Sequence, residues 1–132
     1  MKRNIYVTLA AMVIALLGSG CQPQQSEEST SATEALVKYL NALTSKDEAT
    51  LTLLSCAEWE ANALLELDAF QSVETNLEGL SCRQTADGDG TATVICEGKI
   101  VAGYFDEVQE FDLNQRTYSM VQLGGDWLVC GY

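Results

Sequence analysis

Histidine is absent from this 132-residue chain, and proline occurs once. The absence of histidine removes the commonest general base and a frequent metal ligand. Basic residues are scarce, with 7 Lys and Arg against 19 Asp and Glu, so the formal net charge is −12. Binding to phosphate backbones needs a basic surface, which excludes nucleic acid as an expected partner.

Motifs of enzymatic chemistry are missing as well. The sequence has no Gly-x-Ser-x-Gly elbow, phosphate-binding loop, dinucleotide fingerprint or Cys-x-x-Cys metal pair. We therefore assign no catalytic, cofactor-binding or metal-ligating residues, and we expect a non-enzymatic protein without a cofactor.

The long apolar run lies at the N-terminus. Lys2 and Arg3 precede a mostly apolar segment, residues 5–17, and small residues lead into Cys21. This order predicts a secretory signal peptide over residues 1–20. The run is shorter than the roughly 20 apolar residues of a spanning helix, which disfavours an uncleaved anchor.

The segment before Cys21 resembles the signal of bacterial lipoproteins. Ser19 and Gly20 fit its small-residue positions, whereas Gly18 stands where the pattern usually has Leu, Val or Ile. The resemblance implies lipidation of Cys21 and export, with the protein anchored to the cell membrane on its extracytoplasmic side. An ordinary cleaved signal and an uncleaved anchor remain alternatives. Residues 21–32 are mostly polar and are expected to form a flexible tether.

Four cysteines remain beyond Cys21. They are Cys56, Cys82, Cys96 and Cys130. An even number in an exported domain indicates disulfides, and four cysteines allow three pairings. Cys82 and Cys96 flank the turn-forming residues 87–90, so a hairpin there places them opposite each other. We prefer Cys82–Cys96 with Cys56–Cys130, and four buried free thiols are the alternative.

Three Ser-x-x-Glu capping patterns precede stretches with apolar residues at helical spacing, which predicts three helices. The pairs are Ser31 with Glu34, Ser45 with Glu48, and Ser55 with Glu58. From residue 73 the period changes to that of strands. Strands are predicted over residues 73–83, 91–104, 109–113, 116–123 and 127–130, with turns at 87–90, 105–108 and 124–126. Helices followed by an antiparallel meander describe an α+β domain over residues 33–132.

Residues 35–43 with Lys46-Asp47, and the closing hairpin at 118–129 with its Gly-Asp-Trp sequence, resemble the nuclear transport factor 2-like superfamily. The resemblance spans residues 33–132. It implies three helices packed on a curved antiparallel sheet, a cavity between them, and frequent homodimers. The superfamily contains enzymes, ligand binders and domains without known activity, so it implies no single function. Its aspartate–arginine–aspartate pocket sets have no match here.

Two acidic segments are candidate cation sites. Asp87-Gly88-Asp89-Gly90 resembles the start of a calcium loop, but Thr91 and Gly98 occupy the fifth and twelfth positions, so we prefer a hairpin turn. A second cluster would gather a cation or a basic partner segment, although a solvated hairpin edge is preferred. It comprises Asp106, Glu107, Glu110 and Asp112.

Arg116 and Tyr118 alternate on one predicted strand and therefore share a face, with Asp112 nearby. They would line a polar pocket mouth in which tyrosine donates a proton and a carboxylate accepts it, or form a cross-strand ion pair beside a tyrosine. The candidate pocket aromatics are Trp59, Trp127, Tyr39, Tyr104 and Tyr132, of which Trp127 is expected in the core.

The leading expectation is a membrane-anchored, non-enzymatic module. It would bind a small apolar ligand in its cavity, or use an exposed sheet face for an envelope protein or a second copy. The alternative is an enzyme that uses Asp, Glu or Tyr for acid–base chemistry on a small hydrophobic substrate. A structural accessory domain of an envelope complex is a third possibility.

Overall fold

The structure, a computed structural model, describes residues 30–132. The predicted signal peptide, Cys21 and the predicted tether up to residue 29 lie outside the described residues. Residues 30–132 form three helices followed by a curled antiparallel sheet, which confirms the α+β class and the helices-first order. No helix in this range is long and apolar enough to cross a bilayer.

α1 (Ala32–Ser45) begins at the predicted cap, one residue before the expected domain boundary. The Ser31 hydroxyl accepts a hydrogen bond from the Glu34 N–H at 3.2 Å, and the Glu34 carboxylate accepts one from the Ser31 N–H at 2.9 Å. The Ser31 hydroxyl also donates to the Glu34 carboxylate at 3.1 Å. The two bonds that the carboxylate accepts, the one from the Ser31 backbone first, lower the pKa of Glu34. The apolar face of α1 buries Leu36, Tyr39, Leu40 and Leu43.

The capping prediction for the second helix is wrong. α2 (Glu48–Leu53) is capped by Asp47, whose carboxylate accepts a hydrogen bond from the Thr50 N–H at 3.1 Å. Ser45 is instead the last residue of α1, and Lys46 ends that helix in a left-handed conformation with φ 63°. α1 therefore extends through Ser45, and the second helix begins later than the Ser45 pattern predicted.

The capping prediction for the third helix is also wrong, because Ser55 pairs with the last strand. α3 (Glu60–Phe70) begins after a turn and has no side-chain cap. Ser55 forms a parallel bridge with Val129 of β5 (Asp126–Val129), and the adjacent Cys56 N–H donates to the Val129 carbonyl at 2.9 Å. The backbone at Ser55 is thus extended, and this segment covers the outer edge of β5.

The other strands are β1 (Glu74–Gly88), β2 (Thr91–Tyr104), β3 (Glu107–Asp112) and β4 (Thr117–Leu123). β2 is central, and β1 pairs with it along its length. On the other side, β4 pairs with residues 91–95 of β2, whereas β3 pairs with residues 99–104. β5 extends the sheet beyond β4, and all strand pairings are antiparallel. One edge of β2 therefore pairs with two different strands, while the other edge pairs with β1.

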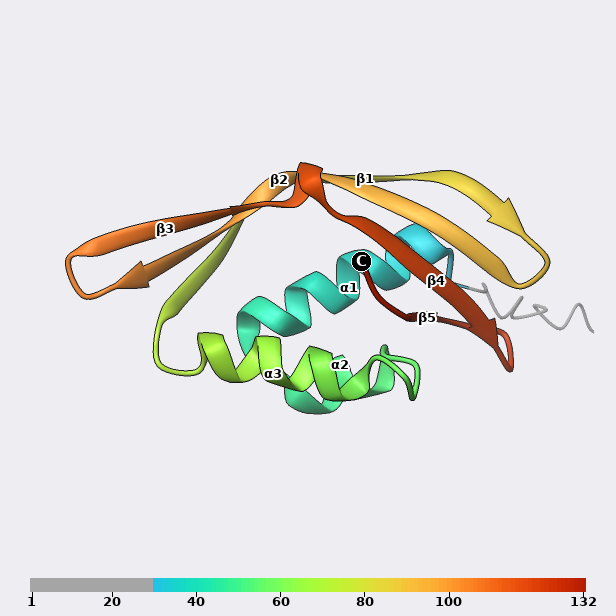
Figure 1. Ribbon diagram of the computed structural model, residues 1–132, viewed down its shortest axis with the longest axis horizontal. Coiled ribbons are helices and arrows are strands. Elements are labelled where there is room, and N and C mark those ends of the chain that lie inside the picture. Colours follow the sequence, from blue (N-terminus) through green and yellow to red (C-terminus); the bar gives the residue numbers. More distant parts are fainter. Residues whose placement is uncertain (1–29) are drawn as a thin grey trace, which may run out of the picture.

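A bulge bends the sheet where β2 passes from β4 to β3. The register of β1 shifts between Glu78 and Ser81, opposite Gly98. Gly98 has φ 103°, and a Cβ there would lie 2.5 Å from the Glu78 carbonyl oxygen, so glycine is required. Figure 1 shows β3 and the end of β2 projecting beyond the helices. We call this hairpin, residues 99–112, the hairpin arm.

The concave face of the sheet packs on the helices in one hydrophobic core. The buried residues of the central strands are Ala92, Val94, Cys96, Ile100, Ala102, Tyr118 and Met120. They belong to the same core as the buried leucines of α1. Side chains therefore occupy the space between α1 and the sheet.

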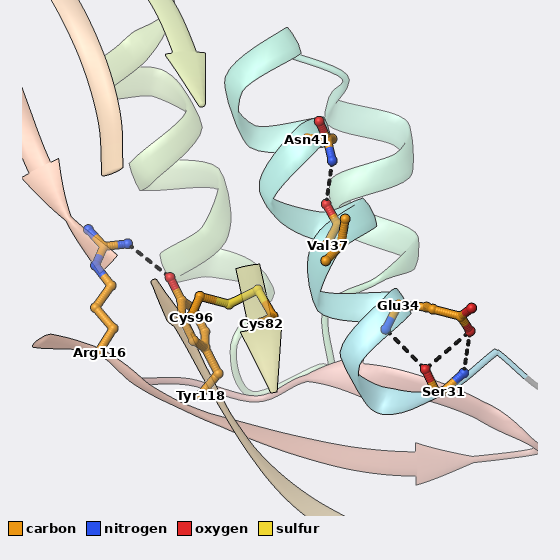
Figure 2. The surroundings of a disulfide bond; sticks show 8 residues. All are labelled: Ser31, Glu34, Val37, Asn41, Cys82, Cys96, Arg116 and Tyr118. Atoms are coloured by element: carbon orange, nitrogen blue, oxygen red, sulfur yellow. Dashed lines mark hydrogen bonds between the residues drawn. A yellow bond between two sulfur atoms is a disulfide. The ribbon is translucent and has the colours of Figure 1, made fainter. Parts of the chain in front are cut away.

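Both preferred disulfides are confirmed. Cys82 and Cys96 are directly paired residues of β1 and β2, with Cα atoms 4.0 Å apart (Figure 2). Cys56 is joined to Cys130 across 74 positions in sequence. The first bond crosslinks a hairpin, and the second ties the chain before α3 to the residue after β5.

Candidate functional site

Arg116 and Tyr118 meet a carboxylate from the helical layer. η1 (Leu113–Gln115) interrupts the sheet edge near Asn114, as predicted, and Arg116 follows it directly. The Arg116 Nη1 donates to Glu66 Oε1 at 2.9 Å and to the Tyr118 hydroxyl at 3.5 Å. The contact between Arg116 and Tyr118 is drawn in Figure 2. The predicted proximity of these two side chains is confirmed.

Asp112 is not the carboxylate that bonds Arg116. Its side chain accepts a hydrogen bond from the Asn114 N–H at 2.9 Å and so caps η1. The carboxylate partner is Glu66 of α3, which sequence analysis missed. The two members of this ion pair are 50 positions apart in sequence, so no local motif connects them.

The position of Glu66 in the sequence of α3 nevertheless indicates that its carboxylate needs a partner. It lies three residues after buried Ala63 and four before buried Phe70, so it shares their side of the helix. A carboxylate on an apolar helical stripe requires a partner, because an isolated buried charge is costly. A search for such residues would have selected Glu66.

Tyr132 packs against the ion pair. The Arg116 guanidinium carbon lies 4.2 Å from the centroid of the Tyr132 ring, and the Tyr132 hydroxyl donates to Glu66 Oε1. The ring also contacts Trp59 edge-on at 5.3 Å and Tyr118 at 5.2 Å between centroids. An aromatic face beside a guanidinium stabilises the cation and fixes its orientation.

The network continues into the core through Trp59, whose indole Nε1 donates to the Tyr39 hydroxyl at 3.0 Å. We call these six residues the Arg116 cluster: Tyr39, Trp59, Glu66, Arg116, Tyr118 and Tyr132. Its members run from fully buried Tyr39 and Tyr118 to partly exposed Tyr132. Of the predicted pocket aromatics, Trp127 and Tyr104 instead lie partly buried at the edge of the core.

A surface depression of about 560 Å³ opens beside the cluster. Its lining is Glu110, Phe111, Asp112, Gln115, Arg116 and Tyr132. The Arg116 and Glu66 side chains are only 16% and 19% exposed. The depression therefore reaches Arg116, one member of a charge pair that is largely removed from water, where polar interactions are stronger than at an open surface.

The environment raises the pKa of three tyrosines of the cluster further above neutral pH. Burial raises the pKa of Tyr39 and of Tyr118, and it also raises that of Tyr132, where the bond to Glu66 adds to the effect. Burial lowers the pKa of Arg116, but Tyr118, Glu66 and Tyr132 outweigh it and the pKa is raised. The cluster thus presents neutral hydroxyls and a permanent cation.

One polar atom of the cluster lacks a partner. Both hydrogen bonds to Glu66, from Arg116 and Tyr132, end on Oε1. Glu66 Oε2 is buried and has no hydrogen-bond partner among residues 30–132. A buried acceptor without a donor costs about 1–3 kcal/mol, which marks a place where a small polar donor would be stabilising.

The other predicted sites do not assemble into a cation site. Residues 87–90 form the end of β1 and a tight turn, as preferred. The four carboxylates of the second cluster are exposed along the hairpin arm, and Glu110 pairs with Lys99 at 2.6 Å. Between residues 30 and 132, one group of potential metal ligands converges, namely Cys56, Glu58 and Cys130. Its two cysteines form a disulfide and are not available as thiolates.

The Arg116 cluster is therefore the candidate site, built from α1, α3, β4 and the chain after β5. Its arrangement can orient a polar ligand through the Arg116 guanidinium, beside the Tyr132 ring. No protein-family model, curated protein or solved structure matches this chain.

Proposed function

We propose that this protein is an exported, lipid-anchored binding module without enzymatic activity, and that the Arg116 cluster with its depression is the ligand site. The single observation that carries the proposal is the largely buried Arg116–Glu66 pair, whose Arg116 lines a depression of about 560 Å³. The apolar run before Cys21 supports export and anchoring. Three helices beneath a curled sheet support the nuclear transport factor 2-like assignment.

The charges of the site select the kind of ligand. Asp112 lines the depression, and the chain carries a net charge of −12, so an anionic ligand is disfavoured. Arg116 disfavours a cationic one. Within residues 30–132, Arg116 bonds to protein acceptors only through Nη1, which leaves Nη2 and Nε for a ligand. We propose a small neutral ligand with a carbonyl or hydroxyl acceptor for Arg116 and a flat apolar part against Tyr132.

Binding is favoured over acid–base catalysis by the state of the tyrosines. A tyrosine whose pKa is raised releases its proton less readily at neutral pH, so it serves as a hydrogen-bond donor. Glu66 is held by Arg116 and Tyr132 together. The enzyme alternative requires Glu66 to be free to exchange a proton with substrate.

Ligand-observed NMR with neutral aromatic amides and alcohols tests the ligand proposal. Benzamide and benzyl alcohol should bind wild-type protein, and Arg116→Gln should weaken binding about tenfold or more because the fork of donors is lost. Arg83→Gln is the matched control, since Arg83 is exposed on β1. Equal binding by both variants would place the site elsewhere. Turnover of a bound compound that Glu66→Gln abolishes would favour the enzyme instead.

The anchor has a separate test. Mass spectrometry of membrane-extracted protein should find a diacylglycerol-modified peptide beginning at Cys21, and Cys21→Ala should release the protein from membranes. A mature N-terminus at another residue would contradict lipidation without affecting the ligand site.

A further inference from the structure

The hairpin arm ends in an exposed apolar tip. Phe105 and Asp106 form the two-residue turn between β2 and β3. The Phe105 side chain is fully exposed and Val108 is 67% exposed. Figure 1 shows this turn at the end of the arm, away from the helices. A fully exposed phenylalanine at the tip gains nothing from the core of its own chain.

The backbone conformation at position 105 makes a phenylalanine there unusual. Phe105 has φ 54°, a left-handed conformation that bulky residues rarely adopt. The other two-residue turns, 89–90 and 124–125, place Gly90, Gly124 and Gly125 at their left-handed positions. The arm therefore has phenylalanine where the same sheet elsewhere uses glycine, at a cost in backbone strain that no internal packing offsets.

The charges around the tip indicate what would cover it. Asp106, Glu107 and Glu110 are exposed near Phe105. An anionic bilayer surface would repel these acids. A second copy of this chain is a poor partner, since Lys46, Lys99 and Arg116 already bond to acceptors of their own chain. The two other basic residues of the described range, Lys38 and Arg83, are exposed on separate elements of a chain whose net charge is −12. The complementary surface is an apolar pocket surrounded by basic side chains.

We propose that the tip, Phe105 with Val108, is a docking element that inserts Phe105 into an apolar pocket with a basic rim on a partner protein. The aromatic ring supplies the buried anchor, and Asp106 and Glu107 pair with the rim. This proposal is independent of the ligand site, because Phe105 lies outside the Arg116 cluster and does not line the depression.

Thermal unfolding of the full mature protein gives the first test. Phe105→Gly removes left-handed strain without removing a packed side chain, so the melting temperature should rise by a few degrees. Val94→Gly, in the core, is the contrasting control and should lower it strongly. A fall in melting temperature for Phe105→Gly would mean that Phe105 stabilises its own domain, and would overturn the proposal.

Photocrosslinking in the cells that make the protein gives the second test. The photoreactive amino acid benzoylphenylalanine replaces Phe105 or, as a control, Asp89 at the tip of the opposite hairpin. A protein adduct specific to position 105 identifies the candidate partner. That protein, purified, should bind wild-type chain, and Phe105→Ala should weaken binding about tenfold or more.

Neutralising the acids of the arm tests whether their charges contribute to binding of the partner. Asp106→Asn with Glu107→Gln should weaken binding to the purified partner severalfold and reduce its salt dependence. Arg83→Gln, at an exposed residue of β1 outside the tip, should leave this binding unchanged. Absence of a position-specific protein adduct, adducts with lipid alone, or full affinity of Phe105→Ala would each overturn the proposal.

Discussion

The two halves of β2 are held in different ways. Residues 91–96 lie between β1 and β4, face the helices, and are crosslinked to β1 through Cys96. Residues 99–104 lie between β1 and β3, and Ile100 and Ala102 are buried in the same core, but the residues of β3 are exposed except for the partly buried Phe111. We call the first region, with β4 and β5, the closed half. The difference teaches that one strand can pair with a core strand along one half and, past a bend, with a strand that is almost entirely exposed.

Truncating one side chain in each region should give the largest difference in stability between the closed half and the hairpin arm. Met120 of the closed half is buried, so Met120→Ala should cost about 2–5 kcal/mol in the free energy of unfolding. Val108 of the hairpin arm is exposed, and Val108→Ala should change it by less than about 0.5 kcal/mol. Urea denaturation of both variants measures the contrast. Similar losses would mean that the arm is packed as tightly as the core.

Removing the disulfide that crosslinks β1 to the first half of β2 should have the next largest effect on stability. Cys82 and Cys96 close a loop with a sequence separation of 14, and replacing both with Ala should destabilise the domain by about 3 kcal/mol. The native Cys56–Cys130 bond remains in this variant as an internal control. Hydrogen exchange should increase mainly in β1 and the first half of β2. Uniform acceleration would show that the bond stabilises the whole domain as one unit.

The two ion pairs provide a smaller contrast. Glu66→Gln should destabilise the protein by about 1–3 kcal/mol, because it weakens the bonds from Arg116 and Tyr132 in a largely buried setting. Glu110→Gln on the arm should have little effect, since Glu110 and Lys99 are more exposed and solvent screens their attraction. Equal melting temperatures for the two variants would contradict the structural role of Glu66.

Deprotonation of Tyr118 should destabilise the closed half at alkaline pH, whereas stability at neutral pH is not affected. Burial raises the folded pKa of Tyr118 above its ordinary value of 10.0. Protonated Tyr118 therefore contributes stability that is fully present below about pH 10 and is lost as pH rises through the folded pKa. Denaturation between pH 8 and 12 should show a steeper alkaline decline for wild type than for Tyr118→Phe. Identical declines would assign the alkaline loss to other groups.

Local patterns predicted those parts of the fold that local interactions determine. Ser31 with Glu34 forms its own capping box, and Cys82 lies opposite Cys96 because a tight turn joins their strands. The same capping pattern failed at Ser55, where the backbone pairs with a strand more than 70 residues later. Tertiary pairing overrides a weak local preference.

The candidate site was predicted only in part for the same reason. Strand alternation placed Arg116 beside Tyr118, since that relation depends on two residues of separation. Glu66 and Tyr132 approach them from α3 and from the chain after β5, and packing alone brings these elements together. Asp112, nearer in sequence, was the wrong choice because its carboxylate caps η1.

Gly98 determines where the tip of the molecule points. The β1 backbone occupies the volume that a side chain at position 98 would need. The absence of a side chain at position 98 therefore sets the direction of the projecting hairpin. Even alanine at this position must displace β1. A single-codon change at residue 98 would therefore shift the course of the hairpin arm while leaving every residue of the tip intact.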